Sequence, residues 1–237
     1  FDFIFICTPL SAYKNIFNQL NKYITKPTLI TDVGSTKVSV IEEFKSCVNN
    51  KHISFVPAHP IAGLEKSGPM YGFAKLFNNR YCILTPLNAD DKFIDSVSNI
   101  WESFGMKVEL MDSKHHDRVL AMTSHIPQLI AYSVVGTATE LETQMQDEVI
   151  KYSAAGFRDF TRLAGSDPIM WRDVYEKNKE AVLEMLDRFS EDLLTYQKAI
   201  RNNDLKFLEK KFSKSKEIRK IIEQIGQAGT FDPTEKN

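Results

Sequence analysis

The sequence predicts an α/β domain with a parallel sheet, followed by a domain of helices only. Up to Asp112, short apolar strand-like runs alternate with helix-like stretches, which is the pattern of βαβ units. After Asp112, long stretches carry apolar residues at helical spacing, without strand-like alternation. We therefore expect residues 1–112 to form the first domain and residues 113–237 the helical one.

The elements expected in the first domain follow from this alternation. The strands are Phe3–Cys7, Thr28–Thr31, Ile53–Val56, Tyr81–Leu84 and Lys107–Met111, and the helices are Ala12–Tyr23, Val38–Cys47 and Asp91–Phe104. The first strand is a continuous apolar run, as in buried parallel strands. Because proteins rarely begin inside a core strand, we expect part of this domain to lie upstream of Phe1.

The second domain is expected to contain several long helices. Its helical stretches lie within Ser113–Leu141, Trp171–Ala199 and Leu205–Ile225, and Pro127 marks a kink in the first. Their apolar faces outnumber those that one small bundle can bury. The sequence therefore predicts a homodimer formed through the helical domain.

Composition limits the classes of partner. The net charge is −1, so no electrostatic argument supports binding to nucleic acid or to a membrane surface. No apolar run approaches the roughly 18 residues of a membrane span. Cys7, Cys47 and Cys82 are odd in number and form no CxxC motif. Reduced thiols fit a cytoplasmic protein best.

The stretch "DVGSTK" begins as the strand Thr28–Thr31 ends. Gly34 lets a ligand approach the backbone closely, and Ser35 or Thr36 is suited to cap the helix that follows. One interpretation is a capped strand-to-helix turn. The other is a ligand site at the carboxyl end of a sheet strand, where open α/β folds bind ligands.

His59 lies in "FVPAHPIAG", where Pro57 and Pro60 stiffen a segment expected to be a loop. A histidine held rigidly at the end of a strand suits a general base, because its ordinary pKa is near 6.5. The alternative is a loop histidine with a structural hydrogen bond.

A third unusual stretch, "GFRDFTRLAGSDPIMW", carries Arg158, Asp159, Arg162 and Asp167. An arginine can bind a carboxylate through two hydrogen bonds, which a lysine cannot. Alternatively, the two arginines pair with the two aspartates. "SDP" predicts the start of a helix, with Ser166 or Asp167 as its cap.

Polar side chains interrupt the apolar helix around Pro127. Ser124, His125 and Gln128 need hydrogen-bond partners if they are buried. Nearby, His115, His116 and Asp117 are adjacent in sequence, so their side chains point about 100° apart on a helix and cannot easily share one ion. We expect no metal site.

Taken in order, "CTP", "DVGSTK", "PAHPIAGLEKSG", "HHD", "TSHIPQ" and "GFRDFTRLAGSDPIMW" resemble the prephenate/arogenate dehydrogenase family, which includes the cyclohexadienyl dehydrogenases of tyrosine biosynthesis. The resemblance covers most of residues 1–198. It implies a Rossmann-type dinucleotide-binding domain, with its amino-terminal half and GxGxxG motif upstream of Phe1, followed by an all-helical dimerisation domain. It also implies oxidative decarboxylation of prephenate or arogenate, with hydride transfer to NAD or NADP, giving 4-hydroxyphenylpyruvate or tyrosine.

The resemblance also implies roles for individual residues. His59 accepts the hydrogen bond of the ring hydroxyl, Ser35 orients the hydroxyl beside the nicotinamide, and Arg162 holds the ring carboxylate. Gln128 stands where the family commonly has histidine, facing the pyruvyl or alanyl side chain. The expected substrate-binding residues further include Ser124, His125, Trp171 and Glu65, with Arg158 and Asp159 near the entrance. The expected cofactor-binding residues are Thr8, Pro9, Asp32, Val33, Gly34 and Ser35.

Two other functions stay open at this point. The chain could be a truncated, non-catalytic product that binds a ring dicarboxylate or only dimerises. It could also be a dehydrogenase of the β-hydroxyacid type, which needs a catalytic lysine in the helical domain and leaves the "HPIAG" and "TRLAGSDP" motifs unexplained.

Overall fold

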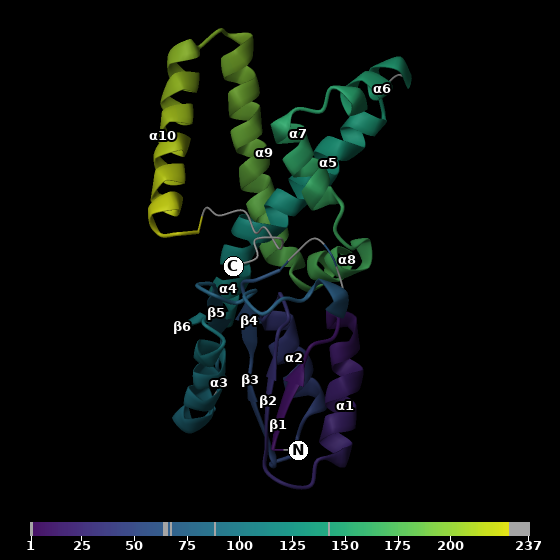
Figure 1. The fold of residues 1–237 in the computed structure, drawn as a ribbon, viewed down its shortest axis with the longest axis vertical. Coiled ribbons are helices and arrows are strands. Elements are labelled where there is room, and N and C mark those ends of the chain that lie inside the picture. Colours follow the sequence, from purple (N-terminus) through teal and green to yellow (C-terminus); the bar gives the residue numbers. More distant parts are fainter. Residues whose placement is uncertain (1, 64–65, 67, 88, 142, 228–237) are drawn as a thin grey trace. The chain divides into compact units, whose positions relative to one another are not determined.

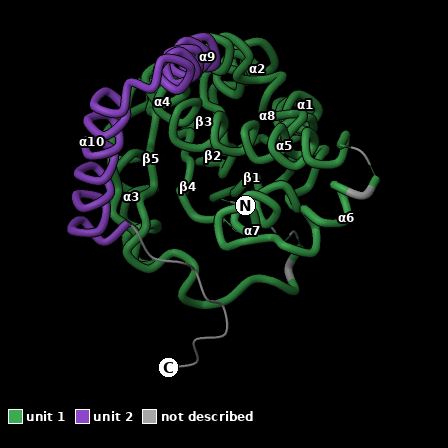
Figure 2. Tube along the Cα trace, turned by 90° about the horizontal axis from the view of Figure 1, so that it is seen from above, with its two compact units in different colours: residues 1–185 green, residues 186–237 purple. Residues whose placement is uncertain are grey.

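The structure is a computed structural model that describes residues 2–63, 66, 68–87, 89–141 and 143–227. The chain divides into two compact units, Phe1–Met185 and Leu186–Asn237 (Figure 2). This division lies within the helices, well after residue 112. The expected domain boundary at residue 112 therefore stays a prediction.

The first sheet of unit 1 is parallel, as predicted. Its strands are β1 (Phe3–Ile6), β2 (Thr28–Asp32) and β3 (Ile53–Val56), in that spatial order (Figure 1). The strands are connected by helices α1 (Tyr13–Tyr23) and α2 (Val38–Cys47), with the short 3₁₀ helix η1 (Leu10–Ala12) before α1. In the register, Ile6 lies beside Asp32, so β1 and β2 end at the same edge.

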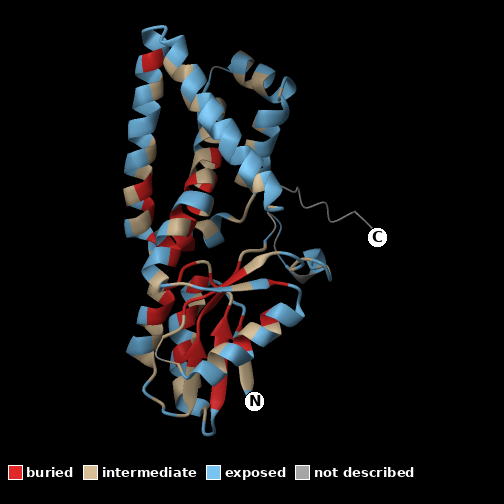
Figure 3. Cartoon of the chain, turned by 90° about the vertical axis from the view of Figure 1, so that its left-hand side faces the viewer, coloured by how far each residue is buried: buried red, intermediate tan, exposed pale blue. Residues whose placement is uncertain are grey.

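The buried positions of β2 face both sides of this sheet. Ile30 packs in a cluster with Phe17 of α1 and Val40 of α2. Leu29 packs on the opposite face, in a cluster with Trp101. Successive strand side chains point to opposite faces, which is why Leu29 and Ile30 pack in different clusters. Buried residues lie on the strands of this sheet and also on helices (Figure 3).

A second set of strands departs from the prediction. β4 (Ala58–Pro60) pairs antiparallel with β5 (Tyr81–Leu84), which pairs parallel with β6 (Lys107–Leu110). His59 was expected in a loop, but it is the central residue of β4 and lies opposite Ile83. A three-residue strand that follows one proline and ends on another is too short for a sequence pattern to reveal. Helix α3 (Asp91–Ser103) connects β5 to β6, and a 3₁₀ turn η2 (Pro69–Tyr71) precedes β5.

The helical part of unit 1 begins with a continuous stretch. It consists of α4 (Ser113–Leu120), a π-helical segment η3 (Ala121–His125) and α5 (Ile126–Thr139). Ile126 donates its N–H to the carbonyl of Ala121, five residues earlier. Pro127, which lacks an N–H, directly follows this widened turn. The structure thus has a π-helical segment directly before the position at which a kink was predicted.

By length and composition alone, this 27-residue stretch could cross a membrane, although its sequence contains no uninterrupted apolar run of the length expected for a span. Three of its buried side chains bond to distant segments of the chain. His116 bonds to His59, His125 to Asn178, and Gln128 to the carbonyl of Leu163. Buried polar groups with specific partners are typical of a core helix in a globular domain.

The remaining helices of unit 1 are α6 (Thr143–Lys151), α7 (Ala155–Ala164), α8 (Pro168–Lys177) and the first part of α9 (Lys179–Arg201). Helix α7 packs against α5 through the bond from Gln128 to Leu163. Asp167 caps α8 by accepting hydrogen bonds from the N–H groups of Ile169 and Met170, as "SDP" predicted.

Unit 2 contains the rest of α9 and helix α10 (Leu205–Gln224). The turn between them places Asn203 in the left-handed region, with φ of 52°, and Asp204 caps α10. Tyr196 of α9 stacks on Phe212 of α10, with ring centroids 6.0 Å apart. The two helices therefore pack on each other through aromatic side chains.

Candidate active site

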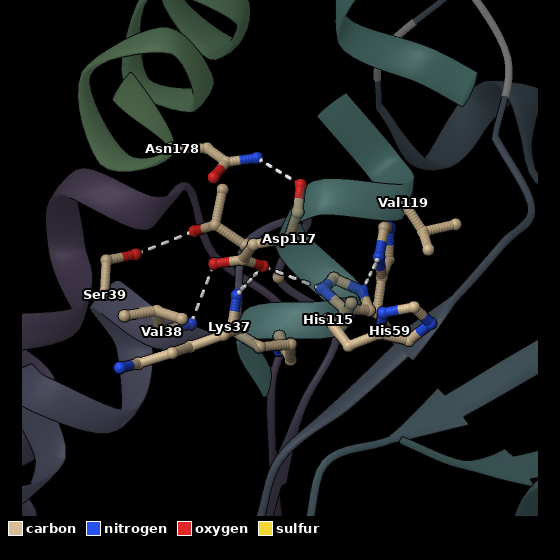
Figure 4. Close-up of polar contacts among 12 residues, drawn as sticks. Lys37, Val38, Ser39, His59, His115, Asp117, Val119 and Asn178 are labelled. Carbon is tan, nitrogen blue, oxygen red and sulfur yellow. Dashed lines mark hydrogen bonds and ion pairs between the residues drawn. The ribbon is translucent and has the colours of Figure 1, made fainter. Parts of the chain in front are cut away.

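A cluster of buried polar side chains lies where β2 ends, beside β4 and the helical stretch that begins at Ser113 (Figure 4). We call it the polar cluster, and its members are Asp32, Lys37, His59, His116, Asp117, His125 and Asn178. None of these residues is more than 9% exposed. Polar groups buried to this extent are costly unless they bond to each other, and these do.

Asp32 connects four segments of the α/β part. Its Oδ2 accepts hydrogen bonds from Lys37 Nζ at 2.6 Å, from Gly34 N at 2.9 Å and from the Tyr13 hydroxyl at 3.0 Å. Its Oδ1 accepts one from Ala58 N at 3.0 Å. The carboxylate, predicted to approach a cofactor, has no exposed surface and is bonded within the protein.

Lys37 is the other half of a buried ion pair with Asp32. Its ammonium group also donates to the carbonyl of Ala58 at 2.7 Å, so Ala58 is held at both its N–H and its carbonyl. Burial lowers the pKa of Lys37, although Asp32 opposes that shift. Since Ala58 directly precedes His59, the Asp32–Lys37 pair fixes the backbone on which His59 stands.

Gly34 is required by crowding within the protein, although its sequence context predicted the approach of a ligand. A Cβ atom at this position would lie 2.9 Å from each of Asp32 Oδ2, Leu10 Cδ2 and the Tyr13 hydroxyl. The backbone angle φ of Gly34 is not positive, so a left-handed conformation is not the reason for a glycine at this position. The glycine therefore lets the turn close tightly around the carboxylate of Asp32.

The predicted cap of α2 was wrong. The helix begins at Val38, and the side chain of Asp117 accepts hydrogen bonds from Lys37 N at 2.8 Å and Val38 N at 2.9 Å. Thr36 instead bonds to the hydroxyl of Ser39. A carboxylate at a helix amino terminus is favoured by the helix dipole as well as by the hydrogen bonds. Ser35 is half-buried, and its hydroxyl bonds to no group in the part of the chain that the structure describes.

Asp117 also starts a chain of hydrogen bonds that ends at His59. Its Oδ1 lies 2.7 Å from His116 Nδ1, and His116 Nε2 lies 2.9 Å from His59 Nδ1. A carboxylate only accepts, so the hydrogen of His116 is on Nδ1 and its Nε2 accepts from His59. His59 therefore carries its hydrogen on Nδ1, and its Nε2 offers a lone pair.

The histidines of the polar cluster are neutral near pH 7. Burial lowers the pKa of His59 well below its usual value, and the nearby His116, Lys37 and His125 lower it further. Burial also lowers the pKa of His116, more than Asp117 raises it. A buried neutral imidazole with an available lone pair can accept a proton or a hydrogen bond.

His125, on the π-helical segment, forms a second branch of the polar cluster. Its Nδ1 lies 3.1 Å from Asn178 Nδ2, which also donates to the backbone carbonyl of Asp117 at 2.9 Å. The ring packs edge-on against Trp171, with centroids 6.0 Å apart. Burial lowers the pKa of His125 to about 4.

The other predicted residues lie outside the hydrogen bonds of this cluster. Gln128 is buried and donates from Nε2 to the carbonyl of Leu163 at 2.8 Å, one residue from Arg162. Arg162, Arg158 and Asp159 lie exposed on α7, Thr8 and Pro9 lie exposed after β1, and Ser124 and Val33 are half-buried. Glu65 lies outside the described residues.

Sequence reasoning did not single out Asn178. It placed Lys37 in the motif "DVGSTK" and His116 and Asp117 in the motif "HHD" without assigning a role to any of the three. Asp117 lies about eighty residues from the helix that it caps, and no local pattern reveals such a contact. Within the described ranges, no three His, Cys, Asp or Glu side chains gather in a group that could hold a metal ion.

Two family models together match most of the chain. Residues 1–110 match the family model "Prephenate dehydrogenase, nucleotide-binding domain", and residues 112–214 match "Prephenate dehydrogenase, dimerization domain". The cyclohexadienyl dehydrogenase of Zymomonas mobilis is 38% identical over 92% of this chain and 74% of its own length. The prephenate dehydrogenase of Lactococcus lactis is 31% identical over 94% of this chain, which spans 61% of that protein.

A solved structure is similar over nearly the whole chain. It is the prephenate dehydrogenase of Aquifex aeolicus in complex with hydroxyphenyl propionate and NAD+. The two chains are 34% identical, with a TM-score of 0.83, over 93% of this chain and 76% of that one.

Proposed function

The chain belongs to the prephenate dehydrogenase family of NAD-dependent oxidoreductases, and on that premise we propose how its residues carry out the oxidative decarboxylation of prephenate. In this reaction the ring carbon that bears the hydroxyl loses hydride to NAD+, and the opposite ring carbon loses its carboxylate as CO2. The ring becomes aromatic, which drives the reaction. The protein must orient both ends of the substrate and accept the hydrogen of the hydroxyl.

His59 accepts the hydrogen bond of the ring hydroxyl through Nε2. The observation that carries this role is the chain of hydrogen bonds from Asp117 through His116 to His59. It leaves the lone pair of His59 on Nε2 and stabilises the positive charge that develops as the hydroxyl transfers its proton. Ser35 lies at the end of β2 and orients the hydroxyl, because a serine alone is too weak a base.

The edge at which β1 and β2 end fits a nicotinamide cofactor. Ligands of open α/β folds bind beyond the carboxyl ends of the strands, and there Thr8 and Pro9 are exposed while Val33 and Ser35 are half-buried. These residues hold the cofactor, which when bound accepts the hydride. Asp32 is fully buried, so it supports the turn and does not touch the cofactor.

The helical part binds the charged ends of the substrate. Arg162, on the exposed face of α7, holds the ring carboxylate. Gln128 of α5 bonds the backbone next to Arg162 and faces the side chain of the substrate. An amide both donates and accepts, so the pyruvyl group of prephenate and the alanyl group of arogenate are both acceptable.

The two alternative functions, a β-hydroxyacid dehydrogenase and a non-catalytic binding protein, account for fewer of these observations. A β-hydroxyacid dehydrogenase needs a catalytic lysine in its helical domain, and in the part of the chain described here the buried lysine is Lys37, paired with Asp32 in the α/β part. A protein that only binds or dimerises has no need for a neutral histidine oriented by a carboxylate.

Steady-state formation of reduced cofactor by the complete protein tests the function. The four combinations of prephenate or arogenate with NAD+ or NADP+ are compared. We expect turnover of both substrates, and the ratio between the cofactors measures whether NADP+ is also used. No turnover in any combination would contradict the proposal.

We also propose a cytoplasmic homodimer. The three cysteines are free thiols, and the second family model is that of a dimerisation domain. Exposed apolar side chains follow the two helices of unit 2, and they are Leu193, Leu194, Ile200, Leu205, Phe212, Ile218 and Ile221. A surface of this kind is typical of an interface between subunits. Sedimentation at micromolar concentration should give a dimer, and a monomer would contradict this assignment.

A further inference from the structure

Asn178 joins the two histidine branches of the polar cluster. It ends α8 just before α9 begins, and it is 5% exposed. Its Nδ2 lies 2.9 Å from the backbone carbonyl oxygen of Asp117 and 3.1 Å from His125 Nδ1. The π-helical segment brings the ring of His125 to this amide, although the two residues lie far apart in sequence.

These two contacts determine where His125 carries its hydrogen. A backbone carbonyl only accepts hydrogen bonds, so the nitrogen of the Asn178 amide must face Asp117. The second hydrogen of that nitrogen points to His125 Nδ1, which must therefore offer a lone pair. In a neutral ring the hydrogen is then on Nε2. Because the pKa of His125 is lowered to about 4, the ring is neutral near pH 7.

His59 has the opposite arrangement. The side chain of Asp117, acting through His116, places the hydrogen of His59 on Nδ1, so its Nε2 is an acceptor. The backbone carbonyl of the same Asp117, acting through Asn178, makes Nε2 of His125 a donor. One residue thus anchors two buried imidazoles that present opposite hydrogen-bonding groups.

We propose that Asn178 is a positioning residue that holds His125 as a neutral Nε2–H donor, and that His125 donates this hydrogen to a carboxylate oxygen of the substrate. The second of these roles rests on the proposed function. Within the described residues, Nε2 of His125 has no hydrogen-bond partner, which leaves it for a ligand. A hydrogen bond to a carboxylate is stronger than one between neutral groups. A donor fixed in this way also disfavours an ammonium group at the same position.

The first test measures the ring directly. Long-range ¹H–¹⁵N correlations of ¹⁵N-histidine-labelled protein at pH 7, assigned through His125→Gln, report which nitrogen carries the hydrogen. We expect the Nε2–H form for His125 and the Nδ1–H form for His59. In Asn178→Asp, a carboxylate that only accepts should place a hydrogen on Nδ1 of His125. An Nδ1–H or doubly protonated His125 in the wild type would overturn the proposal.

The second test measures substrate binding. Asn178→Ala should raise KM for prephenate about ten- to a hundredfold, the loss expected for one hydrogen bond to a charged group, and should lower kcat much less. Asn50→Ala is the matched control, because Asn50 Nδ2 also bridges two backbone carbonyls, those of Asn21 and Ile24, at 3.1 and 2.7 Å. The control should lose stability without a change in KM.

A double mutant separates positioning from a general loss of structure. His125→Gln places an amide nitrogen close to the position of Nε2, and that donor does not depend on Asn178. Adding Asn178→Ala to His125→Gln should therefore change KM by less than about threefold, because the two residues act as one unit. An equally large rise in KM in both backgrounds would overturn the proposal, as would an unchanged KM in Asn178→Ala. Should Asn178→Ala not fold, Asn178→Asp is taken through the same comparison.

Failure of the proposed function gives a different result. A wild-type protein without turnover on either substrate would refute the dehydrogenase assignment. The NMR spectrum would still decide whether Asn178 fixes the hydrogen of His125.

Discussion

The charged residues of the proposed site are buried in the polar cluster but exposed on helix α7. In the cluster, Asp32, Lys37 and Asp117 are buried and bond to each other or to the backbone. On α7, no residue is buried, and Arg158 and Arg162 are exposed. The groups that handle a proton are thus organised by the chain itself, whereas the groups assigned to the substrate lie at the surface. Polar groups that are already oriented before the reaction stabilise the transition state most where charge develops.

The largest effect should come from His59, at the end of the preorganised chain. His59→Asn keeps a hydrogen-bonding side chain but removes the base, so kcat should fall by about 10²–10⁴-fold. KM should change much less, because the lost interaction strengthens mainly in the transition state. His52→Asn, in a half-buried histidine before β3, is the control and should leave kcat unchanged. A wild-type kcat in His59→Asn would show that another group is the base.

The pH dependence sharpens the same comparison. His59 must be neutral to act, so kcat falls as the pH drops through its pKa. Burial, helped by the nearby His116, Lys37 and His125, lowers that pKa well below its usual value, so the acidic limb should lie well below about pH 6.5. The limb should disappear in His59→Asn. If the acidic limb of the wild-type kcat profile has its midpoint at or above the ordinary histidine pKa, the polar cluster does not desolvate His59 as the structure indicates.

Arg162 tests the exposed side of the comparison. In Arg162→Lys, a point charge replaces a group that binds a carboxylate through two hydrogen bonds, and KM should rise about ten- to a hundredfold. The fold should be unaffected, because α7 buries no residue. Arg158→Lys, on the same exposed face, is the control and should change KM less. Unchanged KM for prephenate and arogenate in a folded Arg162→Lys would assign the arginine a structural role.

Gly34 tests how tightly the cluster is packed. In Gly34→Ala the new methyl group meets the carboxylate of Asp32 and two neighbouring side chains at 2.9 Å, so we expect a loss of about 1–3 kcal/mol in the free energy of unfolding. Gly136→Ala in α5 is the matched control, because a Cβ atom at that position would meet no atom within 4 Å. It should gain up to about 1 kcal/mol from helix propensity. Equal midpoints of urea unfolding for Gly34→Ala and Gly136→Ala would show that the side chains around Gly34 move to accommodate the methyl group.

Gly34 also illustrates what the sequence could predict. The alternation of strands and helices, the cap at Asp167 and the position of the motifs follow from local patterns, and the structure agrees with them. The neighbours of Gly34 and the carboxylate that caps α2 come from distant segments, which local patterns cannot locate. The strand at His59 is set by pairing with β5, so the prolines around it suggested a loop. Local signals therefore predict the elements, and tertiary hydrogen bonds decide how the site is built.

Gln128 lies between the two regions, and its substitution should have the smallest effect. It is buried like the cluster, yet its amide nitrogen bonds to the backbone of α7 beside Arg162. The oxygen of the amide can accept from the ammonium group of arogenate, and the second hydrogen of Nε2 can be donated to the pyruvyl group of prephenate. In Gln128→His, an imidazole that is protonated beside the anionic substrate keeps one N–H for the carbonyl of Leu163 and presents a second N–H, but no acceptor, to the substrate.

We therefore expect Gln128→His to shift the ratio of kcat/KM toward prephenate by about fivefold, the equivalent of about 1 kcal/mol for one hydrogen bond. Both substrates are measured with wild type and variant under the same conditions. Gln197→His on α9 is the control, because this residue is not part of the proposed site, and it should leave the ratio unchanged. A wild-type enzyme inactive on one substrate, or a shift toward arogenate, would contradict this role, because the side chain would then not present both a donor and an acceptor to the substrate.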